Sequence, residues 1–159
     1  MSKSQKKGAI DPQEIEPRTG TSYPEPFRQD VVSRRKRALG DAFGLTRYGV
    51  NLVELPPATW SSQRHWHTHE DEFIYVVAGV LTLVTDEGEQ LLAPGMVAGF
   101  PAGDRNGHHL INNSEAVASY LEIGDRNGQD EVFYPDIDLI YKVNDDGDKA
   151  FTNRDGVSF

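Results

Sequence analysis

The amino-acid sequence predicts an all-β protein, an antiparallel β-sandwich or barrel, on three observations. From Tyr48 onward, apolar residues recur at two-residue intervals, which is the period of a strand with one buried face. Turn-forming pairs such as Ala78-Gly79 and Pro94-Gly95 interrupt this pattern at short, regular gaps. The length of 159 residues suits one domain with a hydrophobic core and a short tail. We therefore expect a single β domain built from short strands.

Residues 1–29 are expected to form an extended, partly disordered N-terminal arm. This segment is rich in Pro, Lys, Glu, Gln and Ser, and its prolines prevent a long helix or a central strand. Residues 31–40 predict a short amphipathic helix ending at Gly40, although the same residues also fit two short strands. The arm could lie across the sheet edge of a neighbouring copy, so we predict a homodimer that the arm stabilises; a merely disordered arm is the alternative.

Eight short strands are expected in the central part of the chain. Residues 30–143 are predicted to form the single barrel domain with its flanking elements, and residues 144–159 a polar C-terminal tail. Apolar residues after position 125 can pack a strand or a short helix onto the barrel. The expected strands are 47–55, 62–68, 72–78, 80–85, 89–92, 96–100, 107–112 and 117–123.

The composition excludes several classes of function. The formal net charge of -9 opposes binding to the phosphate backbone of a nucleic acid. The absence of cysteine excludes disulfides, thiolate metal sites and a cysteine nucleophile. The N-terminus has no apolar signal core and no later run has the length of a membrane span, so we expect a soluble cytoplasmic protein without a membrane partner. The basic run Arg34–Arg37 is predicted to be a solvated surface, in preference to a site for an anionic partner.

The histidines are concentrated in two segments that point to a metal site. Strand alternation places His65 and His67 on one face, and Glu72 opens the next expected strand. If that face is the interior, the carboxylate converges on the two imidazoles, and His and carboxylate are ligands for a divalent first-row metal. His108 and His109 are adjacent, so only one of them can point into the barrel.

These residues resemble the two sequence motifs of the cupin superfamily. The resemblance extends from about residue 45 to about residue 125, and it implies a double-stranded β-helix, or jelly-roll barrel, with one metal ion inside. Carried over position by position, the implied metal ligands are His65, His67, Glu72 and His108. The first motif, G-x5-H-x-H-x4-E-x6-G, is matched by His65, His67, Glu72 and Gly79, and the second, G-x5-P-x-G-x2-H-x3-N, by Gly95, Pro101, Gly103, His108 and Asn112.

Two departures from the family pattern affect this assignment. Thr59 stands where the first motif opens with glycine, so the turn into the ligand strand must be made differently. In the second motif a longer loop, residues 104–107, separates Gly103 from the histidine. His108 is favoured as the third histidine ligand, but His109 pairs equally well with Asn113. We expect this loop to determine what is specific about the site.

The resemblance is strong for fold and site and weak for the reaction. Three imidazoles and one carboxylate leave coordination positions open, which suits Zn, Fe, Mn or Ni. The preferred hypothesis is a metal-dependent isomerase or epimerase of a small molecule such as a sugar phosphate, with Glu72 as the catalytic carboxylate, because some similar small cupins are named in this way. The alternatives are an Fe(II) oxygenase of a small organic acid or phenol and a non-catalytic module that binds a small ligand. No inward Arg or Lys for a phosphate can be identified from the sequence.

Other residues near the motifs are given structural roles first. We expect His69, Glu70 and Asp71 to form a turn at the surface, with a minor possibility that one of the acids acts as a general base. Trp66 is expected to pack on the outer face of the barrel, against the arm or a partner subunit. The candidates for the pocket mouth, each with a structural role as the first interpretation, are Arg47, Tyr48, Arg105 and Tyr120.

Overall fold

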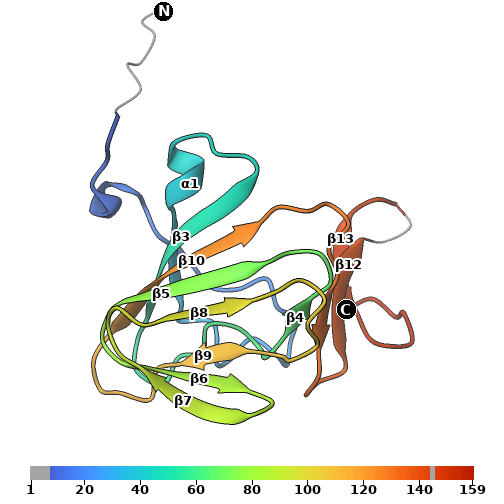
Figure 1. Ribbon diagram of the computed structural model, residues 1–159. Coiled ribbons are helices and arrows are strands. Elements are labelled where there is room, and N and C mark those ends of the chain that lie inside the picture. The colour runs from blue at the N-terminus through green and yellow to red at the C-terminus, as the bar shows by residue number, and fades with distance from the viewer. Residues whose placement is uncertain (1–7, 144–145) are drawn as a thin grey trace, which may run out of the picture.

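The structure, a computed structural model, describes residues 8–143 and 146–159, and it is built from antiparallel strands (Figure 1). The all-β prediction is confirmed, because helices are confined to the short η1 (Pro12–Glu14) and α1 (Leu39–Ala42) in this part of the chain. No helix among these residues has the length and apolar character to cross a membrane.

The largest sheet has six strands in the order β1-β2-β3-β10-β5-β8. A three-stranded sheet, β7-β6-β9, faces it, and a four-stranded sheet, β13-β12-β11-β4, closes one end. In chain order the strands are β1 (Arg18–Thr19), β2 (Arg35–Ala38), β3 (Tyr48–Leu55), β4 (Trp66–His67), β5 (Glu72–Ala78), β6 (Leu81–Thr85), β7 (Gly88–Leu92), β8 (Val97–Phe100), β9 (His109–Ile111), β10 (Ala118–Asp125), β11 (Val132–Tyr134), β12 (Leu139–Val143) and β13 (Lys149–Thr152).

The main hydrophobic core lies between the six-stranded and the three-stranded sheets. Val53 of β3 and Val76 of β5 are fully buried on one side, and Leu81 of β6 is fully buried on the other. Alternate side chains of each strand point inward, as the two-residue period predicts. The turn from β5 to β6 requires Gly79, which has a φ of +75° and whose added Cβ would lie 2.7 Å from Ala118 Cα.

Seven of the eight predicted strands form with boundaries close to those expected, and β5 matches 72–78. The predicted strand 62–68 is shorter, because only β4 is a regular strand there. Isolated bridges connect His65 to His108 and Trp60 to Ile111, and they hold the remainder of this segment beside β9. The first histidine motif therefore joins two sheets.

The predicted helix over residues 31–40 is wrong. Residues 35–38 form β2, which pairs with both β1 and β3, and helical structure is limited to α1. The exposed edge of β3 offers backbone hydrogen bonds that a four-residue strand can satisfy, and this pairing overrides a weak helical pattern.

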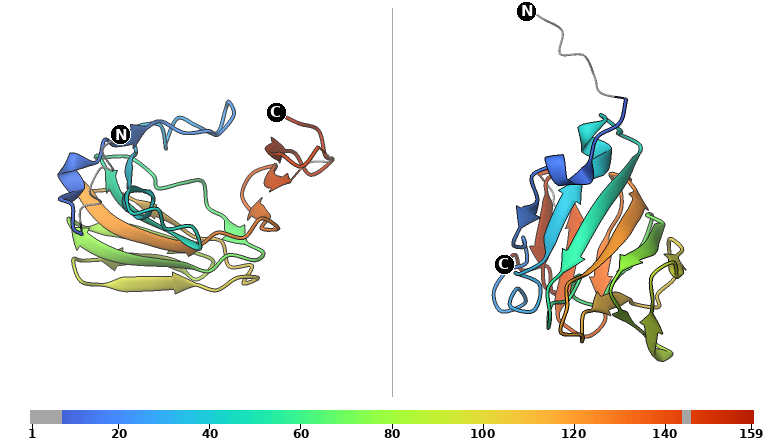
Figure 2. Two further views of the ribbon diagram at one scale, coloured as in Figure 1. Left: turned by 90° about the horizontal axis from the view of Figure 1, so that it is seen from above. Right: turned by 90° about the vertical axis from the view of Figure 1, so that its left-hand side faces the viewer.

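The terminal segments pack side by side and form a second hydrophobic cluster (Figure 2). Tyr23 and Val31 from the N-terminal part contact Val132, Tyr134 and Leu139 from the C-terminal part. The arm therefore lies on its own chain, where β1 pairs with β2. The homodimer stays a prediction. Expected disorder at residues 1–7 lies outside the described residues.

The segment predicted as a polar tail, 144–159, also contributes regular structure. Within it, β13 pairs with β12 from Ile140 to Val143. Residues 144–145 of the predicted tail lie outside the described residues. The apolar side chain of Phe151 packs against the second cluster, which explains why this part of a polar segment is ordered on the body.

Candidate metal centre

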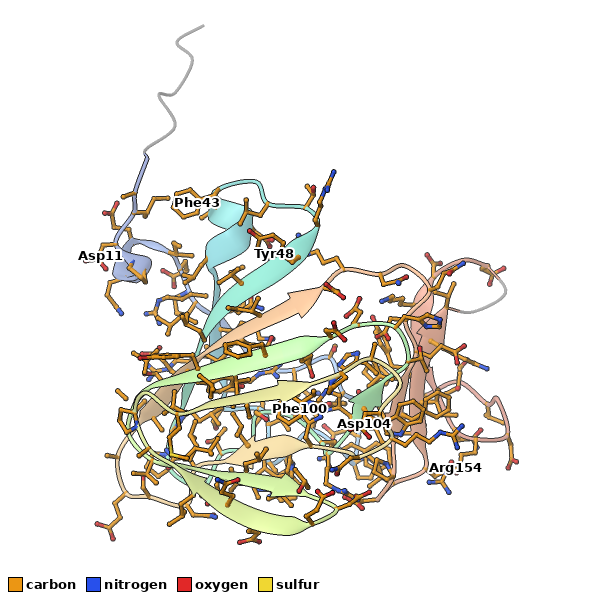
Figure 3. All side chains as sticks on the ribbon, in the orientation of Figure 1. Asp11, Phe43, Tyr48, Phe100, Asp104 and Arg154 are labelled. Carbon is orange, nitrogen blue, oxygen red and sulfur yellow. The ribbon has the colours of Figure 1, made fainter. Side chains whose placement is uncertain are left out.

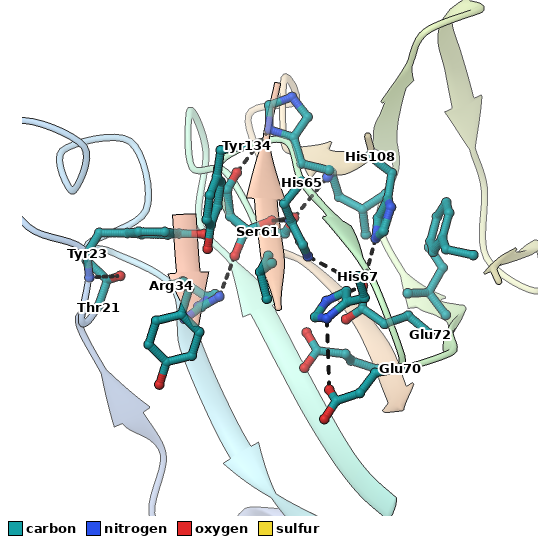
Figure 4. Close-up of a pocket in the computed structure, with 18 of the residues that line it drawn as sticks. Thr21, Tyr23, Arg34, Ser61, His65, His67, Glu70, Glu72, His108 and Tyr134 are labelled. Atoms are coloured by element: carbon teal, nitrogen blue, oxygen red, sulfur yellow. Dashed lines mark hydrogen bonds and ion pairs between the residues drawn. The ribbon is translucent and has the colours of Figure 1, made fainter. Parts of the chain in front are cut away.

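A pocket of about 340 Å³ lies between the barrel and the terminal segments (Figure 4). Its two sides have different origins. One side, here called the metal wall, consists of His65, His67, Glu72 and His108. The other, here called the terminal wall, consists of Tyr23, Arg34, Tyr134, Tyr141 and Phe151. The two walls meet where the rings of His65 and Tyr134 lie 5.9 Å apart.

Three imidazoles converge on one carboxylate oxygen in the metal wall. Glu72 Oε2 lies 3.5 Å from His65 Nε2, 3.3 Å from His67 Nε2 and 2.7 Å from His108 Nε2. Burial raises the pKa of Glu72, but the hydrogen bond from His108 and the two other neighbouring imidazoles have the larger, opposite effect, so its pKa lies well below the ordinary value. The structure thus brings together all four residues that the sequence predicts as metal ligands.

The backbone and Asp130 orient two of these imidazoles with Nε2 toward Glu72. Nδ1 of His65 lies 2.9 Å from the carbonyl oxygen of Gln63, and because a carbonyl only accepts, Nδ1 carries the proton. Nδ1 of His67 lies 2.6 Å from Asp130 Oδ2 in the same way. Because Nδ1 keeps its proton, the nitrogen that can give up a proton and bind a metal through its lone pair is Nε2.

Asp130 was not identified from the sequence, yet it fixes the metal wall from behind. Its carboxylate is 1% exposed, and it also accepts the backbone N–H of His69 at 2.8 Å. Burial lowers the pKa of His67, but the hydrogen bond to Asp130 and the neighbouring carboxylate of Glu72 raise it more strongly, to about 10. Asp130 lies beside His67 because of its position just before β11, and no motif spacing in the sequence indicates this contact.

The adjacent His108 and His109 point in opposite directions. His108 faces Glu72, and its ring stacks on Phe100 with centroids 3.5 Å apart. His109 Nδ1 donates to the carbonyl of Ser62 at 2.9 Å, and its ring packs against Trp60. Burial lowers the pKa of both histidines below the ordinary value. The geometry therefore favours His108 over His109 at the metal wall.

The metal wall fits a divalent metal ion. Among the residues that the structure describes, His65, His67 and Glu72 offer ligand atoms that all lie within 4.8 Å of one another. His67 Nε2 is buried and lies 3.3 Å from Glu72 Oε2 without forming a hydrogen bond to it, so an ion at this point would supply the missing partner. A second group, His67, Glu70 and Asp130, also meets the distance, but Nδ1 of His67 already donates to Asp130 there. The chain thus has residues that could hold one metal ion.

The turn after His67 divides into residues at the pocket and residues at the surface. Glu70 lines the pocket, although it was expected at the surface. Its Oε1 accepts the backbone N–H of Asn127 at 2.7 Å and its Oε2 lies 3.9 Å from His67 Nδ1. Burial raises the pKa of Glu70. His69 and Asp71 are exposed, as expected for a turn.

Of the four candidates for the pocket mouth, one lines the pocket and three do not. Tyr120 lines the pocket and is 1% exposed, whereas Arg47, Tyr48 and Arg105 do not line it. Tyr48 lies exposed at the start of β3 (Figure 3). Arg105 lies over the ring of Trp66, 5.8 Å from its centroid.

Trp66 packs on the outer side of the ligand strand, but not on the arm. Its ring stacks on Phe133 of β11 with centroids 4.9 Å apart. The partner therefore comes from the C-terminal segment, whose pairing with β4 the sequence pattern does not reveal.

The lengthened loop 104–107 does not line the pocket beside the metal wall, and its role in specificity stays a prediction. Asn106 accepts the backbone N–H of Asp86 at 2.8 Å and donates to Glu87 at 2.7 Å, and Arg64 donates to the carbonyl of Gly107. The loop is thus fixed to the turn between β6 and β7. Its extra residues serve this contact.

The basic run Arg34–Arg37 is not the solvated surface that its composition predicts. Arg34 and Lys36 line the pocket, and Arg37 on the other face of β2 is 9% exposed. Strand alternation divides the run between the two faces, which composition alone cannot show. The structure therefore supplies the inward cations that the sequence did not reveal.

Comparisons with known proteins agree with this fold. The family described as "Cupin domain" matches residues 51–124. A sugar phosphate isomerase of the cupin superfamily from Silicibacter pomeroyi has 42% sequence identity and a TM-score of 0.89, over 95% of this chain and 96% of that chain. A protein named provisionally as a sugar phosphate isomerase from Acidithiobacillus ferrooxidans has 30% identity and a TM-score of 0.71, over 80% of each chain.

A third structure shows the fold alone. It is named as a predicted oxalate decarboxylase from Thermotoga maritima and has 17% identity and a TM-score of 0.60, over 75% of this chain and 99% of that chain. No curated protein matches the chain. The chain has both motifs and the barrel, and it matches the Silicibacter pomeroyi protein over nearly its whole length. The chain therefore belongs to the cupin superfamily.

Proposed function

We propose that the chain is a metal-dependent isomerase or epimerase that acts on a small hydroxy-carbonyl compound of the sugar phosphate type. The observation that carries this proposal is the convergence of three Nε2 atoms on Glu72 Oε2, with a second carboxylate, Glu70, in the same pocket. The names of the similar structures at 42% and 30% identity support the same class of reaction.

In this proposal His65, His67, Glu72 and His108 hold one divalent ion, which is Zn, Fe, Mn or Ni. Such an ion polarises the carbonyl group of a bound substrate as a Lewis acid. Phe100 and Asp130 hold two of the imidazoles in place. Tyr23 and Tyr134 reduce access of water to this side of the pocket, because both are nearly buried in the second cluster.

The proton transfer is assigned to Glu70. Isomerisation removes a proton from the carbon next to the carbonyl and returns one to the neighbouring carbon. The sequence predicts Glu72 for this role, but its Oε2 faces all three imidazoles, which favours its use as a ligand. Glu70 lines the same pocket, and its Oε1 is held by the N–H of Asn127, which leaves Oε2 to exchange the proton.

Exchange of substrate hydrogen in D₂O tests this function. The metal-loaded protein is incubated with a panel of aldose and ketose phosphates, and NMR follows deuterium at the carbon beside the carbonyl. We expect exchange with the wild type, loss of exchange with retained metal in Glu70→Gln, and loss of both in Glu72→Gln. Glu87→Gln, on the exposed turn before β7, is the matched control.

Three outcomes would contradict the proposal. No exchange with any of the four metals excludes the isomerase. Uptake of oxygen by the Fe(II) form with a small organic acid or phenol would assign the oxygenase function. Binding of a small molecule without turnover would assign a non-catalytic module.

A further inference from the structure

The four consecutive cations Arg34, Arg35, Lys36 and Arg37 are unequal in their partners. Arg35 and Arg37 both contact Glu54, at 3.7 Å and 2.5 Å. Lys36 contacts Glu122 at 2.7 Å. Among the described residues, no carboxylate lies within salt-bridge distance of Arg34, whereas each of the other three cations of this run has one.

Two arginines of this run have a buried Nε without a hydrogen-bond partner, Arg34 and Arg35, and of these two Arg34 lines the pocket. Its Nη1 donates to the carbonyl of Ser61, while its Nε is buried and has no hydrogen-bond partner. The guanidinium is charged, and leaving one of its buried N–H donors without an acceptor is unfavourable. The site therefore favours an anion that approaches from the pocket.

Arg34 is joined to the metal wall through two adjacent serines. Ser61 accepts from Arg34, and Ser62 Oγ lies 3.2 Å from His65 Nδ1. Figure 4 shows Arg34 beside Ser61 and Tyr23, with the histidines farther along the same pocket. One small molecule could therefore contact Arg34 with one end and the metal wall with the other.

We propose that Arg34 binds the phosphate group of the substrate and thereby determines its class, an inference that rests on the proposed function. Two parallel N–H donors of a guanidinium match two oxygens of a phosphate monoester. Lys36 of β2, the other basic side chain of this run in the lining, is paired with Glu122, which leaves Arg34 to make this contact. The phosphate thus sits at the terminal wall while the hydroxy-carbonyl end faces the metal wall.

Titration of the full-length, chelator-treated protein with inorganic phosphate tests this contact independently of the metal. Calorimetry gives the dissociation constant, and the ¹⁵N–¹H signal of the Arg34 Nε reports the site directly. We expect Arg34→Gln to weaken phosphate binding by about 10- to 100-fold, the range for loss of a charged hydrogen bond. Arg34→Lys keeps the positive charge but lacks the two parallel N–H donors. Its phosphate affinity should therefore lie between those of the wild type and Arg34→Gln.

Arg35→Gln is the matched control, because Arg35 is the adjacent residue on the other face and does not line the pocket. We expect its phosphate affinity to stay within about twofold of wild type. The Arg34 Nε signal in the wild type should shift at saturating phosphate, which needs no variant to fold. Metal content and deuterium exchange are measured separately, so failure of the proposed function leaves this result interpretable.

Three results would overturn the assignment. They are equal phosphate binding in wild type and Arg34→Gln, an Arg34 Nε signal that does not move at saturating phosphate, and an effect of Arg34→Gln on acetate binding but not on phosphate binding. The last of these would assign a carboxylate ligand instead. In an active preparation, Arg34→Gln should raise KM for a sugar phosphate more than it lowers kcat.

Discussion

The metal wall and the terminal wall enclose the same pocket, but the chain builds them by different means. The metal wall comes from residues 65–72 and His108, and strand alternation aims its side chains. The terminal wall comes from segments more than 100 residues apart, since Tyr23 and Tyr134 belong to one hydrophobic cluster. Local geometry therefore determines the first wall, and long-range packing determines the second.

Because of this difference, we expect substitutions in the two walls to affect different properties of the protein. Changes in the metal wall should affect metal binding with little effect on folding. Changes in the terminal cluster should affect folding with little effect on metal stoichiometry. Asp130 is an exception, because it lies in the C-terminal segment and yet accepts a hydrogen bond from His67 of the metal wall.

Removal of a proposed metal ligand should have the largest effect. We expect His67→Ala to lose its metal after dialysis and to lose activity, because Nε2 of His67 is one of the converging donors. Elemental analysis of the dialysed protein measures this. His69→Ala, an exposed histidine two residues away, should keep the metal. A fully loaded His67→Ala would refute the site.

A cavity in the terminal cluster should have the next largest effect. Leu139 is 1% exposed, and Leu139→Ala should reduce the free energy of unfolding by about 2–5 kcal/mol. Urea denaturation of the chelator-treated protein measures this, with Leu91→Ala as the control because Leu91 is 68% exposed. A fall in metal stoichiometry in the folded Leu139→Ala protein would contradict the expectation that the terminal cluster affects folding and not metal binding.

Asp130→Asn tests the residue that joins both regions. The variant keeps the shape of the side chain but weakens the hydrogen bond to His67 Nδ1, and metal affinity should fall by about 10- to 100-fold. A chelator competition titration measures the affinity. Asp125→Asn, which changes an exposed acid five residues earlier in the chain, should leave the metal affinity unchanged. Unaltered affinity in Asp130→Asn would show that the ring needs no support from behind.

The smallest effect is expected from an ion pair outside both walls. Hydrogen bonds from Arg64 lower the pKa of Asp136 below its ordinary value. The ionised carboxylate therefore stabilises the fold above its unfolded pKa of about 3.9, and this contribution disappears as the pH falls through the lower folded pKa. Because the Asp136 side chain is 58% exposed, the difference from Asp136→Asn should be at most about 1 kcal/mol.

Measurements of unfolding by urea at several pH values test this last prediction. Wild type should be more stable than Asp136→Asn at neutral pH, and the two should converge in acid. A difference that persists in acid would show that the pair does not act through charge. Glu89→Gln, whose parent residue is exposed on β7, is a suitable control.

Much of the barrel could be predicted from the sequence because its determinants are local. The two-residue period of β5 fixes which side chains enter the core, and the spacing from His65 to Glu72 brings the ligands to one face. The choice between His108 and His109 remained open, since adjacent residues on a strand are equivalent until the neighbouring layer is known. Stacking on Phe100 distinguishes them.

The sequence by itself determined the all-β class and the strand periods, because each depends on residues a few positions apart, and its resemblance to two family motifs indicated the set of metal-capable side chains. Only the tertiary structure decided the remainder of the pocket. Asp130 reaches His67 because β11 pairs with β4, and Arg34 enters the pocket because β2 pairs with β3. Such contacts depend on which strand edges meet, and no local pattern encodes that pairing.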